Sequence, residues 1–131
     1  MAKNKLITES EHIEQRNLFL WAKDCVNLNI YPELEMMFAI PNVSYGGGKA
    51  NLIRGAKLKA EGRKSGVPDI FLPVARRSYN GLFIEMKASD GRVSDNQKDW
   101  INKLQGQGYL AEVCIGCQQA QELIEWYLNG K

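Results

Sequence analysis

A proline at residue 68 fixes where one short apolar run begins, and a second run follows soon after it. Pro68 has no backbone N–H and favours an extended residue before it, so we expect a strand over residues 69–74. In the run 82–87, apolar residues alternate with others, and Glu85 and Lys87 stand two residues apart. Because strand side chains alternate between the two faces of a sheet, Glu85 and Lys87 point the same way.

The segment between the two runs predicts that they are neighbouring strands. Residues 75–81 end in Asn80–Gly81, a dipeptide typical of β-hairpin turns. Antiparallel pairing then brings Asp69 to the face that carries Glu85 and Lys87, so two carboxylates and one ammonium group meet at one place. A salt-bridged strand pair without a catalytic role has the same pattern, and on these residues alone both interpretations stay open.

The remaining patterns predict a single mixed α/β domain over residues 1–131, a length that suits one domain with its own core. The expected order is αβαββαβα, which places a central mixed β-sheet between helices. The spacing of apolar residues and the turn signals predict helices at 8–29, 50–61, 94–106 and 118–128, and strands at 35–40, 69–74, 82–87 and 109–115.

Two acids on the first predicted helix are candidates for the same cluster. Projected at 100° per residue, Glu11 lies near the centre of the apolar stripe and Glu14 toward its edge. A buried acid needs a partner such as a metal ion or a lysine. The spacing Thr8–x–x–Glu11 also fits a capping box at a helix start, so both interpretations of Glu11 remain. Ile13 and Leu20 fall on the opposite side, where they would suit a protein–protein contact.

A basic segment precedes the Pro68 turn. The net charge of +2 does not by itself indicate a nucleic-acid partner, but six cations against one acid between residues 49 and 64 form a patch that attracts phosphates. A solvated helix face is the competing interpretation. The glycine-rich loop at 44–49 lacks the pattern of a phosphate-binding P-loop. The six cations are Lys49, Arg54, Lys57, Lys59, Arg63 and Lys64.

The cysteines and the histidine offer no competing chemistry. Cys114 and Cys117 have the spacing of a metal or redox pair, but no second pair completes a site, and a buried cysteine at a strand end is favoured. His12 is the only histidine, so no Ser–His or Cys–His arrangement is available. No stretch reaches the ~20 apolar residues of a membrane span, and the polar start predicts no signal peptide. We therefore expect a cytoplasmic protein without a membrane partner.

The acidic cluster suits one kind of chemistry. Two carboxylates with a third in reach are typical ligands for Mg²⁺ or Mn²⁺. Such an ion activates water and neutralises charge that grows on a phosphodiester. A lysine on the same face can orient the water or stabilise the phosphate oxygens, and the acids beside it keep it charged. The residues therefore indicate metal-assisted hydrolysis of phosphodiester bonds.

The order of the motifs also resembles a known family. The motifs Gly66–Val67–Pro68–Asp69, Ile84–Glu85–Met86–Lys87 and Ser94–x–x–Gln97–x–x–Trp100 follow one another as in the VRR-NUC family, a branch of the PD-(D/E)XK nucleases. The similarity runs from about residue 11 to residue 128. It implies a restriction-endonuclease-like core, a requirement for Mg²⁺ or Mn²⁺, and cleavage of DNA by structure more than by sequence.

The resemblance also implies roles for single residues. Asp69 and Glu85 would hold the metal together with the main-chain carbonyl of Met86, and Lys87 would position water or phosphate. Glu11 would complete the acidic set, directly or through water, although a shift of one helical turn would exchange it for Glu14. Gln97 would support the site from the following helix, whereas Ser94–x–x–Gln97 also fits a capping box.

The resulting expectation is a stand-alone, phage-like nuclease similar to Holliday junction resolvases. It would be a homodimeric, Mg²⁺- or Mn²⁺-dependent endodeoxyribonuclease that cuts branched DNA such as Holliday junctions or flaps, as in DNA repair. The alternative is a non-catalytic nucleic-acid-binding subunit with a nuclease-like fold. An RNA-directed nuclease of the same fold is a third possibility.

Overall fold

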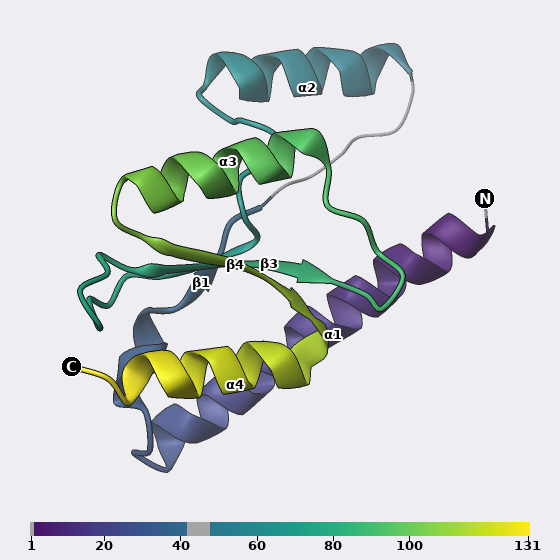
Figure 1. Ribbon diagram of the computed structural model, residues 1–131. Helices are drawn as coiled ribbons and strands as arrows, with labels where there is room; N and C mark the ends of the chain where they lie inside the picture. Colours follow the sequence, from purple (N-terminus) through teal and green to yellow (C-terminus); the bar gives the residue numbers. More distant parts are fainter. Residues whose placement is uncertain (1, 42–47) are drawn as a thin grey trace.

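The computed structural model describes residues 2–41 and 48–131, and the side chains from residue 10 onward within those ranges. Most of the glycine-rich loop at 44–49 lies outside the described residues. Within the described part, no helix is long and apolar enough to cross a membrane. The elements, in chain order (Figure 1), are α1 (Ala2–Asn27), the 3₁₀ helix η1 (Pro32–Met36), β1 (Phe38–Ala39), α2 (Lys49–Ala60), β2 (Ile70–Leu72), β3 (Leu82–Lys87), α3 (Asp95–Gly106), β4 (Leu110–Ile115) and α4 (Gly116–Leu128).

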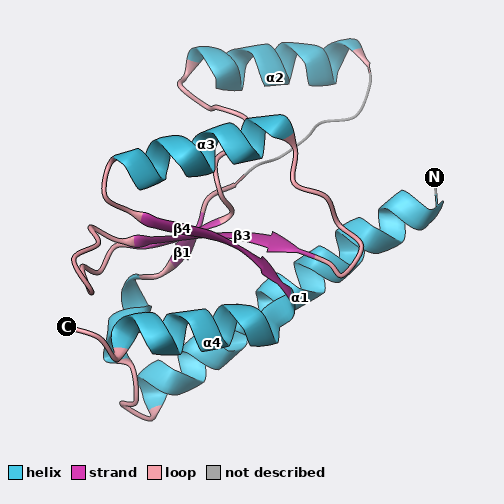
Figure 2. Ribbon diagram, in the orientation of Figure 1, coloured by secondary structure: helices cyan, strands magenta, loops and turns pink. Residues whose placement is uncertain are grey.

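The strands form a mixed sheet between two layers of helices, as predicted. Among the described residues the strand order is β1-β2-β3-β4. The pairs β1–β2 and β2–β3 are antiparallel, whereas β3–β4 is parallel. The helices α1 and α4 cover one face of the sheet, and α3 and α2 lie on the other side (Figure 2). A parallel β3–β4 pair requires a crossover, and α3 provides it.

The core lies between the sheet and the pair α1 and α4. Side chains from alternate positions of β2 and β3, among them Ile70 and Ile84, are fully buried against Leu18 of α1 and Ile124 of α4. The hydroxyl of Tyr127 is buried in this layer and donates a 2.6 Å hydrogen bond to the carbonyl of Val74. This packing fixes the register of the central strands, since a slip of one residue would turn Ile84 away from α1 and α4 and place Glu85 in the apolar core.

The first helix and the first strand differ from their predicted bounds. The helix begins at Ala2, so Thr8 lies inside it and cannot act as the N-cap of a capping box with Glu11. The segment 35–40 is only partly a strand, because Pro32 starts a 3₁₀ helix that buries Leu34 and delays the strand to Phe38. The predicted strand at 69–74 is shorter too, and ends at Leu72.

The hairpin between β2 and β3 exists, but its tight turn is not at Asn80–Gly81. Positive φ angles of 53° and 68° fall on Arg77 and Ser78, and the N–H of Tyr79 donates to the carbonyl of Arg76. The guanidinium of Arg77 lies 3.9 Å from the ring centroid of Trp126 and donates to the carbonyl of that residue. These contacts hold Arg77 in a conformation that the local sequence does not favour.

Candidate active site

Asp69, Glu85 and Lys87 meet at the end of the β2–β3 pair, as the sequence predicted. The register pairs Ile70 with Ile84, so its continuation by one residue sets Asp69 opposite Glu85. The Oδ2 atom of Asp69 accepts a 2.8 Å hydrogen bond from the backbone N–H of Met86, which locks the carboxylate onto the neighbouring strand. The ammonium of Lys87 lies 3.8 Å from Oε2 of Glu85.

Two of these three side chains are ionisable groups inside the protein. Glu85 is 2% exposed and Lys87 is 8% exposed. The second carboxylate oxygen of Glu85, Oε1, is buried and has no hydrogen-bond partner in the structure. A buried carboxylate oxygen without a donor is costly, so this atom is the clearest sign that a ligand belongs here.

The environment of Glu85 favours its neutral form in the metal-free protein. Burial is the largest cause that raises the pKa of Glu85, to about 9, and the neighbouring carboxylate of Asp69 acts in the same direction. The charge of Lys87 lowers this pKa, whereas the more distant Glu11 raises it slightly. The metal-free site therefore keeps a proton on Glu85 at neutral pH, and a cation at the site would displace it.

Glu11 approaches this cluster from α1 across the loop that follows β3. A Cβ atom built on Gly91 would lie 3.1 Å from Oε1 of Glu11 and 3.3 Å from Cδ of Lys87, so Gly91 fits between the two side chains because it has none of its own. Glu11 is half-buried, and it is one of the charges that act on Glu85. The structure thus places Glu11 beside the acid pair.

Glu14 has a different position and a different partner. Its Oε2 atom accepts a hydrogen bond of 2.5 Å from the backbone N–H of Cys117, in the first turn of α4. An acid at a helix N-terminus satisfies an otherwise unpaired N–H and interacts well with the helix dipole. Glu14 therefore ties α1 to the start of α4, which leaves Glu11 as the acid of this helix that faces the cluster.

This difference gives a direct test. We expect Glu14→Ala to lower the free energy of unfolding by about 1–2 kcal/mol while it leaves the cluster intact, because it removes a cap between two helices. Glu11→Ala should change stability less but should weaken divalent-cation binding. Thermal unfolding and cation titration of both variants measure the two effects. If Glu14→Ala alone lost cation binding, the assignment of Glu11 would be wrong.

Gln97 occupies the capping position that the sequence also allowed. Its Oε1 atom accepts a 2.9 Å hydrogen bond from the N–H of Ser94, and the Ser94 hydroxyl accepts from the N–H of Gln97. This capping box starts α3. The carbonyl oxygen of the Gln97 side chain is thereby engaged, and support of the acid site by Gln97 stays a prediction.

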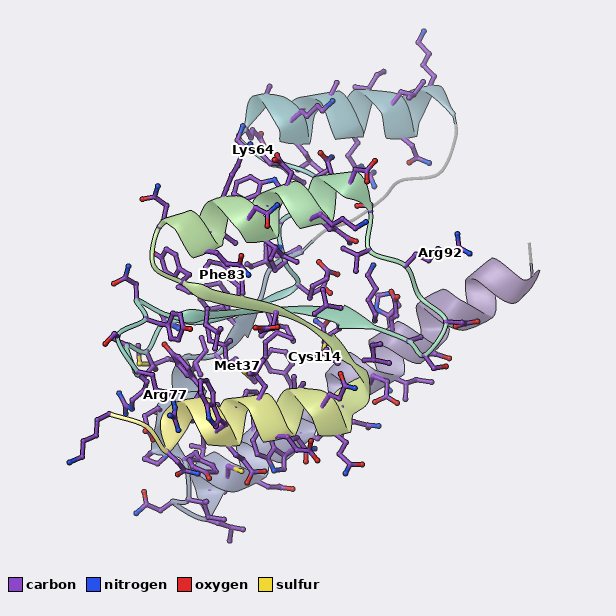
Figure 3. The ribbon with its side chains drawn as sticks, in the orientation of Figure 1. Met37, Lys64, Arg77, Phe83, Arg92 and Cys114 are labelled. Carbon is purple, nitrogen blue, oxygen red and sulfur yellow. The ribbon has the colours of Figure 1, made fainter. Side chains whose placement is uncertain are left out.

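The basic segment lies on the same side of the sheet as α3. Its first four cations, Lys49, Arg54, Lys57 and Lys59, are on α2, a helix that buries none of its residues. Arg63 and Lys64 lie in the connection from α2 to the Gly66 turn, and Lys64 follows the end of α2 on the side of α3 (Figure 3).

One cation on the loop after β3 falls outside the segment that the sequence singled out. Arg92 is exposed on the loop between β3 and α3, next to the Gly91 that contacts Glu11 and Lys87 (Figure 3). The sequence shows only an ordinary polar loop at this point, since the approach of Gly91 to the site depends on contacts between distant parts of the chain. Cys114, in contrast, has the predicted structural role: it is buried in β4, and burial raises the pKa of its thiol to about 12.

Comparison with known proteins decides the family. The sequence pattern of the VRR-NUC domain matches residues 9–118, which include all three residues of the central cluster. The chain belongs to the VRR-NUC family. A solved structure described as a "VRR_NUC domain protein" is 26% identical, with a TM-score of 0.72, and the match covers 91% of this chain and 88% of that one. A comparison with curated proteins finds no match.

Membership in the VRR-NUC family gives the chain a nuclease-type fold and indicates DNA as the substrate. The match to the similar VRR-NUC structure covers nearly the whole chain, so the two proteins share the same overall fold. The family match also agrees with the order of motifs in the sequence.

Proposed function

We propose that this VRR-NUC protein is a Mg²⁺- or Mn²⁺-dependent endodeoxyribonuclease that cuts branched DNA. The observation that carries the proposal is the buried, unpartnered Oε1 of Glu85 beside Asp69 and Lys87. Within residues 2–41 and 48–131, no three acidic, histidine or cysteine side chains are grouped closely enough to hold an ion by themselves. The acid pair would therefore need the main-chain carbonyl of Met86 and water, with Glu11 at longer range.

The donors fit a hard divalent cation. Carboxylates, a backbone carbonyl and water are the ligands that Mg²⁺ prefers, and Mg²⁺ usually keeps several waters when bound. A bound cation would supply charge neutralisation at the phosphodiester and activation of water. Asp69 is already oriented by the N–H of Met86, so its carboxylate needs little reorganisation to act as a ligand.

Lys87 would act on the substrate from the same face. Its side chain is almost buried and its Nζ atom lies 3.8 Å from Oε2 of Glu85, so its position is restricted. An ammonium held next to a phosphodiester can donate to a non-bridging oxygen or orient the attacking water. The cations of α2 and the exposed Arg92 would contact flanking phosphates, and a branched DNA offers phosphates on more than one arm.

A homodimer would suit a branched substrate. Ile13 and Leu20 are exposed on the outer side of α1, where they could contact a second copy of the chain. Two copies related by a two-fold axis could present one site to each of two opposed strands of a junction. Light scattering at micromolar concentration tests this part, and a monomeric mass would contradict paired cutting.

The activity test compares a four-way junction, a flap and a plain duplex that share one sequence. Each is incubated with Mg²⁺, with Mn²⁺ or with EDTA, and the products are separated on denaturing gels. We expect cleavage of the junction or the flap, weaker cleavage of the duplex, and none in EDTA. Cleavage that persists in EDTA would contradict the proposed site. Binding without cleavage under all conditions would identify a non-catalytic DNA-binding subunit, and preference for RNA versions would identify an RNA-directed nuclease.

A further inference from the structure

An aromatic row crosses the sheet on the face that carries the acid site. The rings of Phe71 and Phe83 are stacked, with centroids 4.2 Å apart and planes 17° apart. Phe38 of β1 meets Phe71 edge to face at 5.7 Å. Tyr109, just before β4, meets both Phe71 and Phe83. The row thus runs across the whole width of the sheet.

The row is buried in its interior, at Phe83, and open at its β1 end. Phe83 is 9% exposed and lies between the sheet and α3 (Figure 3), whereas Phe38 is 48% exposed on the edge strand. A Cβ atom on Gly81 would lie 2.9 Å from the ring of Phe71, so this glycine makes room for the ring to lie flat along the sheet. An exposed phenylalanine supported by a packed row of rings is a rigid apolar surface.

The open end is close to the acids. Phe38 is paired with Phe71, and Phe71 is two residues from Asp69 on the same strand and the same face. Two residues of a strand span about 7 Å, and neighbouring strands are about 5 Å apart. The face that holds Asp69, Glu85 and Lys87 therefore continues directly into the exposed ring of Phe38.

We propose that Phe38, backed by Phe71, is a platform on which an unpaired base of the DNA substrate stacks while the adjoining phosphate lies at the acid site. The position of the platform favours a base as its occupant. By these spacings the Cα atom of Phe38 lies about 9 Å from that of Asp69 and about 12 Å from that of Glu85, a span that the nucleotide next to the scissile phosphate can cover. The cations of α2 on the same side of the sheet attract a polyanion. This inference rests on the proposed nuclease function and adds a reason for preferring branched DNA, which has unpaired or unstacked bases, over plain duplex.

The test measures binding in EDTA, where the acid site is inactive. The probes are a flap whose unpaired base next to the branch is 2-aminopurine, a fluorescent base that is quenched by stacking, and a matched plain duplex. We expect Phe38→Ala to weaken flap binding by roughly 5- to 150-fold, because base–aromatic stacking contributes about that factor, and to abolish the quenching. Phe38→Trp should retain both, whereas Phe38→Leu should lose the quenching. Duplex binding should change little.

Trp126→Ala is the matched control, because Trp126 is also 48% exposed but belongs to α4 on the opposite side of the sheet. It should bind both probes like the wild type. The proposal is overturned if Phe38→Ala binds the flap normally, if it loses flap and duplex equally, or if it converts a dimer to a monomer in light scattering, which would make the ring a contact between two copies. If Phe38→Ala binds the flap normally and the wild type cuts DNA, only the proposed base platform is overturned, and the proposed nuclease function stands. A wild type that binds no DNA would overturn the nuclease function as well.

Discussion

Replacing Glu85 with glutamine is expected to raise the melting temperature of the metal-free protein at pH 8 by on the order of 5 °C and to abolish Mg²⁺-dependent cleavage. The pKa of Glu85 is raised from 4.5 to about 9 in the folded protein, mainly by burial and then by Asp69. The folded state therefore binds a proton that the unfolded state has lost, and its stability falls as the pH rises from about 4.5 to about 9. Glutamine resembles the neutral acid and removes this pH-dependent loss.

Binding of a divalent cation should make the wild type more stable than Glu85→Gln, the reverse of the order expected without the cation. In the wild type, a divalent cation would hold Glu85 in its charged form and raise the melting temperature, most strongly at high pH because proton release no longer opposes binding. Glu85→Gln should gain little from the same cation. Thermal unfolding at pH 5, 7 and 9, with EDTA and with Mg²⁺, measures both effects. The control is Glu112→Gln, which replaces an exposed acid on the neighbouring strand β4. A wild type that is more stable at pH 9 than at pH 5 in EDTA would contradict the assigned protonation.

The two substitutions Asp69→Asn and Asp69→Ala should both abolish cleavage but differ in stability. The Asp69 carboxylate accepts the N–H of Met86 at 2.8 Å. Asparagine keeps an acceptor oxygen in this position, whereas alanine leaves a backbone N–H in the sheet without a partner. An unpaired buried donor costs about 1–3 kcal/mol, so Asp69→Ala should be less stable than Asp69→Asn by this amount. Both variants remove the negative charge of Asp69 beside Glu85, so the effect of that charge cancels in the comparison.

Denaturant unfolding in EDTA gives the stability difference, and the flap assay in Mg²⁺ gives the activity. The exposed Asp90→Asn should leave both unchanged. Equal stability of Asp69→Asn and Asp69→Ala would show that the bond to Met86 contributes nothing to the fold. Cleavage by Asp69→Asn at the wild-type rate would remove Asp69 from the site altogether.

The central strands could be predicted because the residues that determine them lie close together in the sequence. Alternation in 82–87 places Glu85 and Lys87 on one face, and burial of the other face of the strand fixes the register that brings Asp69 to them. Which of Glu11 and Glu14 faces the cluster could not be decided from neighbouring residues in the sequence. Both acids lie near the apolar stripe of α1, and only the position of the α4 N-terminus shows that Glu14 is its cap.

The turn and the aromatic row depended on contacts between distant residues. Asn80 is not in the tight turn because its side chain donates to the carbonyl of Gln107 and its N–H to that of Gly108. The turn falls instead at Arg77, whose N–H donates to the carbonyl of Lys131 at the far end of the chain. The exposed ring of Phe38 likewise follows from a strand start that the 3₁₀ helix before it displaces.

The absence of buried side chains on α2 has a consequence for how a VRR-NUC domain of this kind can diversify. Because α2 adds nothing to the core, substitutions there should change the free energy of unfolding little. An isolated helix of 12 residues is in any case only marginally stable in water. The acid pair, in contrast, is set in the most constrained strands of the protein. Substitutions that change the charge and contacts of α2 can therefore accumulate while Asp69 and Glu85 stay the same.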